Sequence, residues 1–169
     1  MLAGNAFRHQ MVLPSQQFIY DYWRSKCKGG RLPGREAIEP WDIHEHLPMI
    51  SLLEIEEQEG QARFRYRLAG TGFWEMFQQE IQGLYLDELP IGDKCQYWHR
   101  VLEQIVRTGK PLAGMTRPNT PCRAHLAQFW LRLPLSEDGH TVSMILGFDH
   151  LVKQEELPQS LPQKQKIFA

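Results

Sequence analysis

Hydrophobic and basic residues alternate between positions 63 and 68, where Phe64, Tyr66 and Leu68 each follow an arginine. This two-residue period predicts a half-buried β-strand, with the aromatic side chains on one face and the arginines on the other. An apolar segment at 49–56 precedes it and ends in an acidic turn, so we expect the two segments to form a hairpin. After Gly70 the spacing becomes helical, which predicts a short helix directly after the second strand.

Two longer segments have the spacing of amphipathic helices. Residues 93–108 place an apolar stripe on one side and end at Gly109, as helices commonly do. Residues 15–27 place an aromatic stripe on one side and end at Gly29-Gly30. The two stripes consist of Trp98, Val101, Leu102 and Ile105, and of Phe18, Ile19, Tyr22 and Trp23. Because the aromatic stripe has to cover apolar surface, it packs either on its own domain or on a second copy of the chain.

The remaining segments complete the order of elements. A short helix is expected at 41–47, a helical turn at 84–89, and strands at 112–117, 124–135 and 141–149. The last two strands are joined across Asp138-Gly139, a common hairpin turn. This order predicts an α+β fold: a five-stranded antiparallel sheet with helices on one face, plus an N-terminal helix.

The length of 169 residues suggests one domain with appended ends. Hydrophobic residues make up 42% of the chain, which is enough to form a core. Residues 1–14 show no period and are interpreted as a flexible arm. The N-terminal helix is assigned to 15–30 and the main domain to 31–152. Residues 153–169 are rich in Gln, Lys and Pro and are interpreted as a flexible tail.

Charge and composition exclude several classes of protein. The formal net charge is −1, so the chain lacks the basic excess of a nucleic-acid-binding protein. No apolar run is long enough to span a membrane, and the N-terminus lacks the pattern of a secretory signal. Cys27, Cys95 and Cys122 are odd in number and widely spaced, which favours reduced thiols and a cytoplasmic location.

An ordered series of motifs between about residues 18 and 150 resembles a compact family of PAS domains found mainly in alphaproteobacteria. The motifs are Tyr22-Trp23-Arg24, Gly29-Gly30-Arg31-Leu32-Pro33, Ile38-Glu39-Pro40, Leu47-Pro48, Arg65-Tyr66-Arg67-Leu68-Ala69-Gly70-Thr71, Gly83, Gly109-Lys110-Pro111, Leu133-Pro134-Leu135-Ser136 and Ile145-Leu146-Gly147. The resemblance implies the same sheet and helices that the periodicity predicts. PAS domains in general are sensory or interaction modules, often dimeric through an N-terminal helix, but this family implies no agreed ligand. The chain departs from the family's usual acidic strand at residues 127–132, so contacts made by that acid are not implied here.

In such a fold a small apolar or aromatic ligand would lie between the sheet and the long helix. The residues predicted to converge there are Phe64, Tyr66, Leu68, Phe73, Phe77, Trp98, Leu102, Phe129, Leu131, Met144, Leu146 and Phe148. Side chains of this kind also fill ordinary cores, so two alternatives stay open: a cavity that holds a ligand and a filled core.

The sequence requires no cofactor or metal. His99 could ligate a haem, but it lies at the edge of the apolar stripe of its helix and is more simply a surface or partly buried histidine. Flavin photochemistry would need a reactive cysteine after the second strand, and Cys95 lies on a different helix. His44 and His46 could pair on a metal, but no third ligand has a matching position.

Two further motifs have simple explanations. The arginines at 63–67 are predicted to pair with Glu54 and Glu56 across the hairpin rather than with phosphates. Gly70-x-Gly72 lacks the next glycine of a dinucleotide-binding loop and is interpreted as a strand-to-helix joint. The residues form no polar constellation of an enzyme, so catalysis is not expected.

These observations favour a stand-alone cytoplasmic PAS protein that binds a small molecule or a protein partner and signals through a dimer or partner contact. Because no kinase, cyclase or DNA-binding segment accompanies the domain, its output is expected to pass through a signalling protein. The chain is predicted to form a homodimer, and the dimer or partner contact is predicted on the aromatic stripe of residues 15–27. The alternative is a ligand-free interaction or scaffold domain with a filled core.

Overall fold

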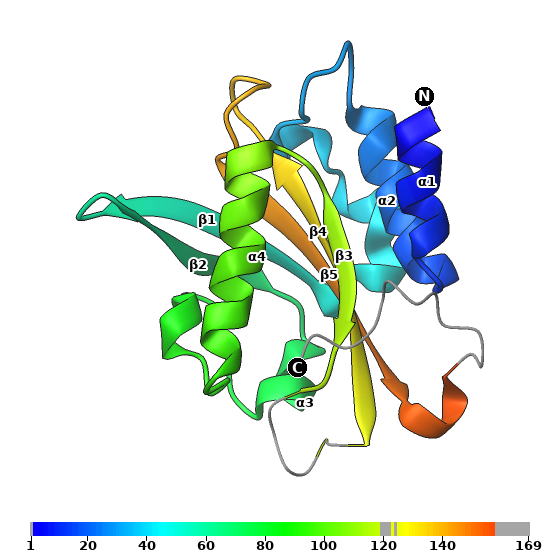
Figure 1. Cartoon of the computed structure of the whole chain (residues 1–169), viewed down its shortest axis with the longest axis vertical. Coiled ribbons are helices and arrows are strands. Elements are labelled where there is room, and N and C mark those ends of the chain that lie inside the picture. Colours follow the sequence, from blue (N-terminus) through cyan, green and yellow to red (C-terminus); the bar gives the residue numbers. More distant parts are fainter. Residues whose placement is uncertain (1, 119–122, 124, 158–169) are drawn as a thin grey trace.

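The structure, a computed structural model, describes residues 2–118, 123 and 125–157, and their side chains from residue 5 onward. Five antiparallel strands form one sheet in the order β2-β1-β5-β4-β3 (Figure 1). The strands are β1 (Ile50–Gln58), β2 (Gln61–Ala69), β3 (Leu112–Thr116), β4 (Leu126–Leu135) and β5 (Met144–Lys153). The α-helices are α1 (Leu2–Gln10), α2 (Pro14–Lys26), α3 (Phe73–Phe77) and α4 (Lys94–Thr108). Shorter 3-10 helices are η1 (Arg35–Ala37), η2 (Pro40–Met49), η3 (Leu86–Glu88) and η5 (Gln154–Glu156).

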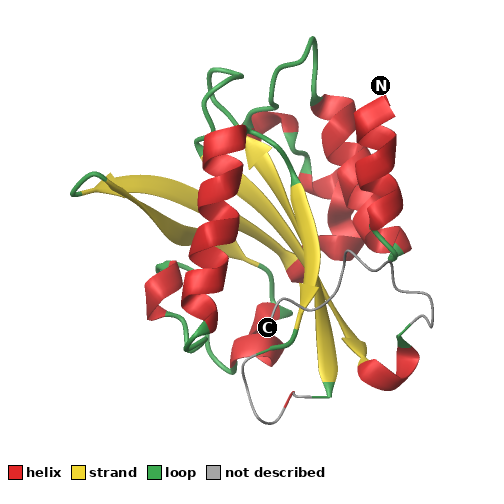
Figure 2. Ribbon diagram, in the orientation of Figure 1, coloured by secondary structure: helices red, strands yellow, loops and turns green. Residues whose placement is uncertain are grey.

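Helices lie on both sides of this sheet (Figure 2). One side, which we call the α4 face, is covered by α3, η3 and α4, and its core includes Leu53, Phe64 and Ile145. The other side, the α2 face, is covered by α2 and η2. The predicted five-stranded sheet is therefore confirmed, and the N-terminal helix adds a second layer to it.

The aromatic stripe of α2 packs on the chain's own sheet. Ile19 is fully buried, and Trp23 is 5% exposed, with its indole nitrogen donating to the carbonyl of Pro134 at 2.9 Å. The side-chain amide of Gln16 donates to the carbonyl of Trp130 on the same strand. Of the two alternatives for this stripe, the structure shows the intramolecular one for Ile19 and Trp23, whereas Phe18 stays 47% exposed.

β4 is buried on both faces because it lies inside the sheet between two helical layers. Leu131, Leu133 and Leu135 pack in the core of the α2 face. The alternate positions point the other way, so that Trp130 packs in the core of the α4 face. The side chain of Arg132 shares that face and lies over the ring of Trp98 in α4, 4.8 Å from its centre.

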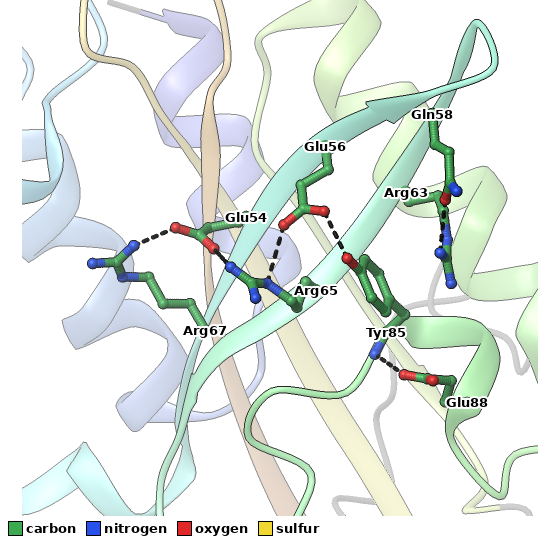
Figure 3. Close-up of polar contacts among 8 residues, drawn as sticks. All are labelled: Glu54, Glu56, Gln58, Arg63, Arg65, Arg67, Tyr85 and Glu88. Carbon is green, nitrogen blue, oxygen red and sulfur yellow. Dashed lines mark hydrogen bonds and ion pairs between the residues drawn. The ribbon is translucent and has the colours of Figure 1, made fainter.

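The outer side of the β1–β2 hairpin carries a ladder of charged side chains (Figure 3). Arg65 contacts Glu54 at 2.7 Å and Glu56 at 3.1 Å, and Arg67 also pairs with Glu54. The predicted cross-strand pairing is thus confirmed for these two arginines. Arg63 instead pairs with Asp87 of η3 at 3.0 Å, which ties the hairpin to the segment before α4.

The ends of the chain differ from the sequence prediction. The flexible arm expected at 1–14 was wrong for residues 2–10, which form α1. Among residues 5–11, Phe7, whose ring contacts Tyr20, and Met11 just beyond the helix join the core cluster of the α2 face. The flexible tail expected from residue 153 was wrong for residues 153–156, because β5 includes Lys153 and η5 follows it. Residues 158–169 and Cys122 lie outside the described part of the chain.

Candidate ligand site

A small cavity lies between the sheet and the helices of the α4 face. Its volume is about 30 Å³, which is room for one or two water molecules. The lining residues are Tyr66, Phe73, Met76, Phe77, Leu89, Pro90, Ile91, Lys94, Trp98, Arg117, Pro118, Gln128 and Arg132. The wall is thus mostly apolar and aromatic, with a few polar groups placed among the rings, the composition typical of small-molecule sites.

Arg132, one of the lining residues, forms a buried ion pair with Asp149. Arg132 Nη1 lies 2.9 Å from Asp149 Oδ2, and the two side chains are 3% and 0% exposed. Arg132 Nη2 donates a hydrogen bond to Asp149 Oδ1 at 3.1 Å, so the guanidinium lies against both carboxylate oxygens. Gln128 Nε2 donates to the same oxygen at 2.7 Å. The carboxylate is therefore held by a guanidinium and an amide, and the pair is neutral overall.

Arg132 is held from several sides at once. Its Nη1 donates to the carbonyls of Leu131 and Phe148, at 3.0 and 3.3 Å, and the Trp98 ring covers the guanidinium. A cation against an aromatic face gains electrostatic energy, more so where water is excluded. Packing and hydrogen bonds thus restrict this side chain to one position beside the cavity.

The phenol of Tyr66 lies in the same enclosed region, and the side chain is 5% exposed. Burial raises the pKa of Tyr66 to about 12, with opposing smaller effects of Arg132, which lowers it, and Asp149, which raises it. At neutral pH Tyr66 is therefore an uncharged group that can donate a hydrogen bond into the cavity.

Lys94, in the first turn of α4, and Arg117, just after β3, complete the polar lining. Lys94 Nζ donates to Thr116 Oγ1 at 3.1 Å and lies 5.7 Å from the centre of the Tyr97 ring. Lys94 is half-buried and Arg117 is exposed. Two cations therefore lie on the side of the cavity where α4 begins and β3 ends.

The structure divides the predicted pocket residues between two faces. Phe64, Tyr66, Phe73, Phe77, Trp98 and Leu102 lie on the α4 face, and four of them, Tyr66, Phe73, Phe77 and Trp98, line the cavity. Leu131, Leu146 and Phe148 are buried in the core of the α2 face, where Met144 also packs, and Phe129 packs beside the chain just after α1. Leu68 is 38% exposed. The prediction of a pocket position was therefore wrong for six residues: Leu68, Phe129, Leu131, Met144, Leu146 and Phe148. Alternation shows which residues of a strand share a face, but not which helix covers that face.

Five polar residues of the site were not predicted: Lys94, Arg117, Gln128, Arg132 and Asp149. The last three lie on β4 and β5 at positions that alternate with the apolar residues predicted to face the pocket. A signal was present, since Arg132 and Asp149 are opposite charges within two predicted strands joined by a hairpin. Opposite charges inside otherwise apolar strands indicate a buried pair when both faces are covered.

The histidines considered for haem or metal lie elsewhere. The ring of His99 contacts Phe64, and His99 is not among the residues that line the cavity. His46 lies between Phe18 and Phe148, and the ring of His44 stacks on Trp41. Within the described ranges, no group of three or more His, Cys, Asp or Glu residues could hold a metal ion. In the same described residues, no helix is both long and apolar enough to cross a membrane.

Comparisons with known proteins agree on the fold. A family model described as PAS domain matches residues 11–149. The chain is similar to VqmA of Vibrio cholerae, with a TM-score of 0.52 and 10% identity over 72% of this chain and 55% of that chain. It is also similar to VqmA bound to DPO, with a TM-score of 0.50 and 11% identity over 68% and 58% of the two chains.

A third similar structure is the LOV protein of Rhodobacter sphaeroides, with a TM-score of 0.47 and 15% identity over 63% of this chain and 61% of that chain. The matches span between 55% and 61% of the length of these three chains. Among curated proteins, none matches the sequence. At identities of 10% and 11% the two VqmA structures support the fold alone.

Proposed function

This chain belongs to the PAS-domain family, and on that premise we propose that it is a sensory or regulatory module that binds a small molecule on its α4 face. The bound state is passed to a protein partner. The observation that carries the proposal is the polar cluster of Gln128, Arg132 and Asp149, which borders a cavity inside an otherwise apolar layer. Cavities with a few convergent polar groups are the usual sites of small ligands.

The energetics of the cluster support this assignment. Replacing a buried ion pair by apolar side chains of similar volume is often neutral or stabilising, so such a pair is poor evidence for stability. A contribution to stability therefore does not explain the pair of Arg132 and Asp149, whereas a role in ligand binding would. Tyr66 adds a donor that stays protonated at neutral pH.

The first experiment is mass spectrometry of the denatured extract of freshly purified protein, together with its absorption spectrum. A small metabolite in stoichiometric amount is the expected result, because a cavity of about 30 Å³ has no room for a chromophore. Leu89→Phe, which enlarges a cavity-lining side chain, should lose the molecule, and Leu84→Phe, at a residue outside the lining, should keep it. Equal retention by both variants would place the molecule elsewhere, and an empty extract with a bare 280 nm band would favour the alternative below.

The alternative is a ligand-free interaction domain, and the small size of the cavity favours it. A volume of about 30 Å³ means that the core is close to filled. Interaction would then use exposed aromatic side chains, among which Trp41 is 81% and Phe18 47% exposed. Phe18 and His44 line a surface hollow, and the ring of Trp41 stacks on that of His44.

We call Phe18, Trp41, His44 and His46 the Phe18/Trp41 surface, and assign the proposed homodimer contact to it. Ile19 and Trp23 of the predicted contact pack on the chain's own sheet, so Phe18 is the exposed part of the stripe.

The partly buried free thiols of Cys27 and Cys95 support a reducing compartment, and hence the cytoplasm, as the location.

A further inference from the structure

The lining of the cavity has an unbalanced charge. Lys94, Arg117 and Arg132 are among its described lining residues, and no aspartate or glutamate is. The segments outside the described ranges contain no aspartate or glutamate either, so they add no acidic side chain to the site. A small enclosed space lined by cations of one sign raises the local concentration of anions.

The three cations differ in how far they are compensated. Arg132 is neutralised by Asp149 through two contacts. Lys94 has the hydroxyl of Thr116 as its hydrogen-bond acceptor, which carries no charge. Arg117 is exposed beside Pro118 on the cavity lining. None of the ion pairs within the described residues includes Lys94 or Arg117, so these two charges stay uncompensated at the cavity.

We propose that the cavity selects a small carboxylate, with its charged end at Lys94 and Arg117 and its body among the rings of Tyr66, Phe73 and Trp98. The inference rests on the proposed function, because it names the ligand class of the same site. An oxygen of a carboxylate accepts charge-assisted hydrogen bonds from both cations, and the aromatic wall covers a short carbon chain. The volume of about 30 Å³ holds one or two water molecules, so the ligand is one of the smallest carboxylates, such as acetate, with its charged end extending beyond the cavity toward the exposed Arg117.

Acetate and acetamide provide a matched test, because they have nearly the same shape and differ in charge. Each is titrated into the full chain at constant ionic strength, and the side-chain N–H signals of Trp98 and Gln128 are followed by NMR. Both groups line the cavity, whereas the exposed indole of Trp41 serves as an internal reference. Acetate should shift the two cavity signals saturably and leave Trp41 unchanged, and acetamide should bind at least about tenfold more weakly.

Two variants test the role of the cations. Lys94→Met keeps the apolar stem and removes the charge, and it should weaken acetate binding at least about tenfold. Arg100→Met is the matched control, since it removes a charge from an exposed position on the same helix. It should leave the affinity unchanged. If Lys94→Met fails to fold, Arg117→Gln replaces it, because Arg117 is exposed.

Each other outcome overturns the inference in a recognisable way. Equal binding of acetamide would mean a ligand site without selection for charge, so that the proposed function stands and the ligand class is wrong. Saturable binding of phosphate or chloride at the same signals, tighter than that of acetate, would assign the site to an inorganic anion. Lack of any shift by acetate rejects the inference alone, since the proposed function is judged by the retained molecule and the Leu89→Phe variant.

Discussion

Arg132 and Asp149 are joined diagonally across β4 and β5. In the register of the two strands Arg132 lies opposite Gly147, and Asp149 lies opposite Trp130. The ion pair, 2.9 Å from Nη1 to Oδ2, therefore passes beside Gly147, where a Cβ would lie 3.3 Å from Arg132 Nη1. The absence of a side chain at Gly147 thus gives the pair the room to close under α4.

Removing one partner of this pair should be costly. Asp149→Asn leaves the Arg132 guanidinium buried without a counter-charge, and we expect a loss of about 3–5 kcal/mol in the free energy of unfolding. Urea denaturation followed by circular dichroism measures the loss. The control is Asp87→Asn, at an exposed partner of Arg63, which should cost less than about 1 kcal/mol. Equal losses in the two variants would show that Asp149 is not desolvated as described.

Tyr66 should make stability fall at high pH. Its pKa is raised to about 12 in the folded state, above the ordinary value of 10.0. Below pH 10 the folded and the unfolded chain both keep the phenol proton, so the contribution of Tyr66 to the free energy of unfolding is fully present. Between pH 10 and 12 the unfolded chain releases the proton while the folded one holds it, so stability decreases by up to roughly 1.4 kcal/mol per pH unit.

Tyr66→Phe isolates this contribution, since burial also raises the pKa of Tyr20 and Tyr97. Urea denaturation at pH 9 and pH 11 should show a smaller decrease for the variant than for the parent chain. The same decrease in both proteins would mean that the phenol of Tyr66 titrates normally.

Substitution of Trp23 should destabilise the protein, whereas substitution of Trp41 should not. Trp23→Ala removes a buried indole and its hydrogen bond to the carbonyl of Pro134, so it should cost about 3–5 kcal/mol of stability. Trp41→Ala removes a side chain that is 81% exposed and should leave stability nearly unchanged. Thermal unfolding of the two variants side by side checks both expectations, and a large loss at Trp41 would contradict its exposure.

Self-association should depend on Trp41. If the Phe18/Trp41 surface forms the proposed homodimer contact, Trp41→Ser lowers the sedimentation coefficient at micromolar concentration toward that of a monomer. Trp74→Ser is the matched control, because Trp74 is 56% exposed in α3 and is not part of that surface. Identical sedimentation of the parent and both variants would remove this surface as a dimer contact.

Gly70 should not accept a side chain. A Cβ at this position would lie 2.1 Å from the carbonyl oxygen of Leu47 and 2.4 Å from that of Pro48, both of which are backbone atoms. Gly70→Ala therefore forces η2 and β2 apart, at an expected cost of at least about 2 kcal/mol. At Gly34 the three atoms nearest to a Cβ belong to the flexible end of Glu36, so Gly34→Ala should cost less. Denaturant midpoints of the two variants provide the comparison.

Local pairing was predictable where a short turn connects the partners. Glu54 and Arg65 are close in sequence, and alternation places both on the same side of a hairpin, so their contact could be expected. The pairing of Arg63 with Asp87 could not be expected. It depends on where the chain returns after α3, and no sequence period encodes that position.

The sequence by itself determined the strands, the long helix and the five-stranded antiparallel sheet, because period, turn residues and helix ends are local properties of the chain. Only the tertiary structure decided which side of β4 faces α4. Both phases of that strand are buried, so hydrophobicity could not distinguish them. It thereby placed Gln128, Arg132 and Asp149 at the cavity and gave Ile19 and Trp23 to the opposite layer, since burial of a residue depends on which element covers it.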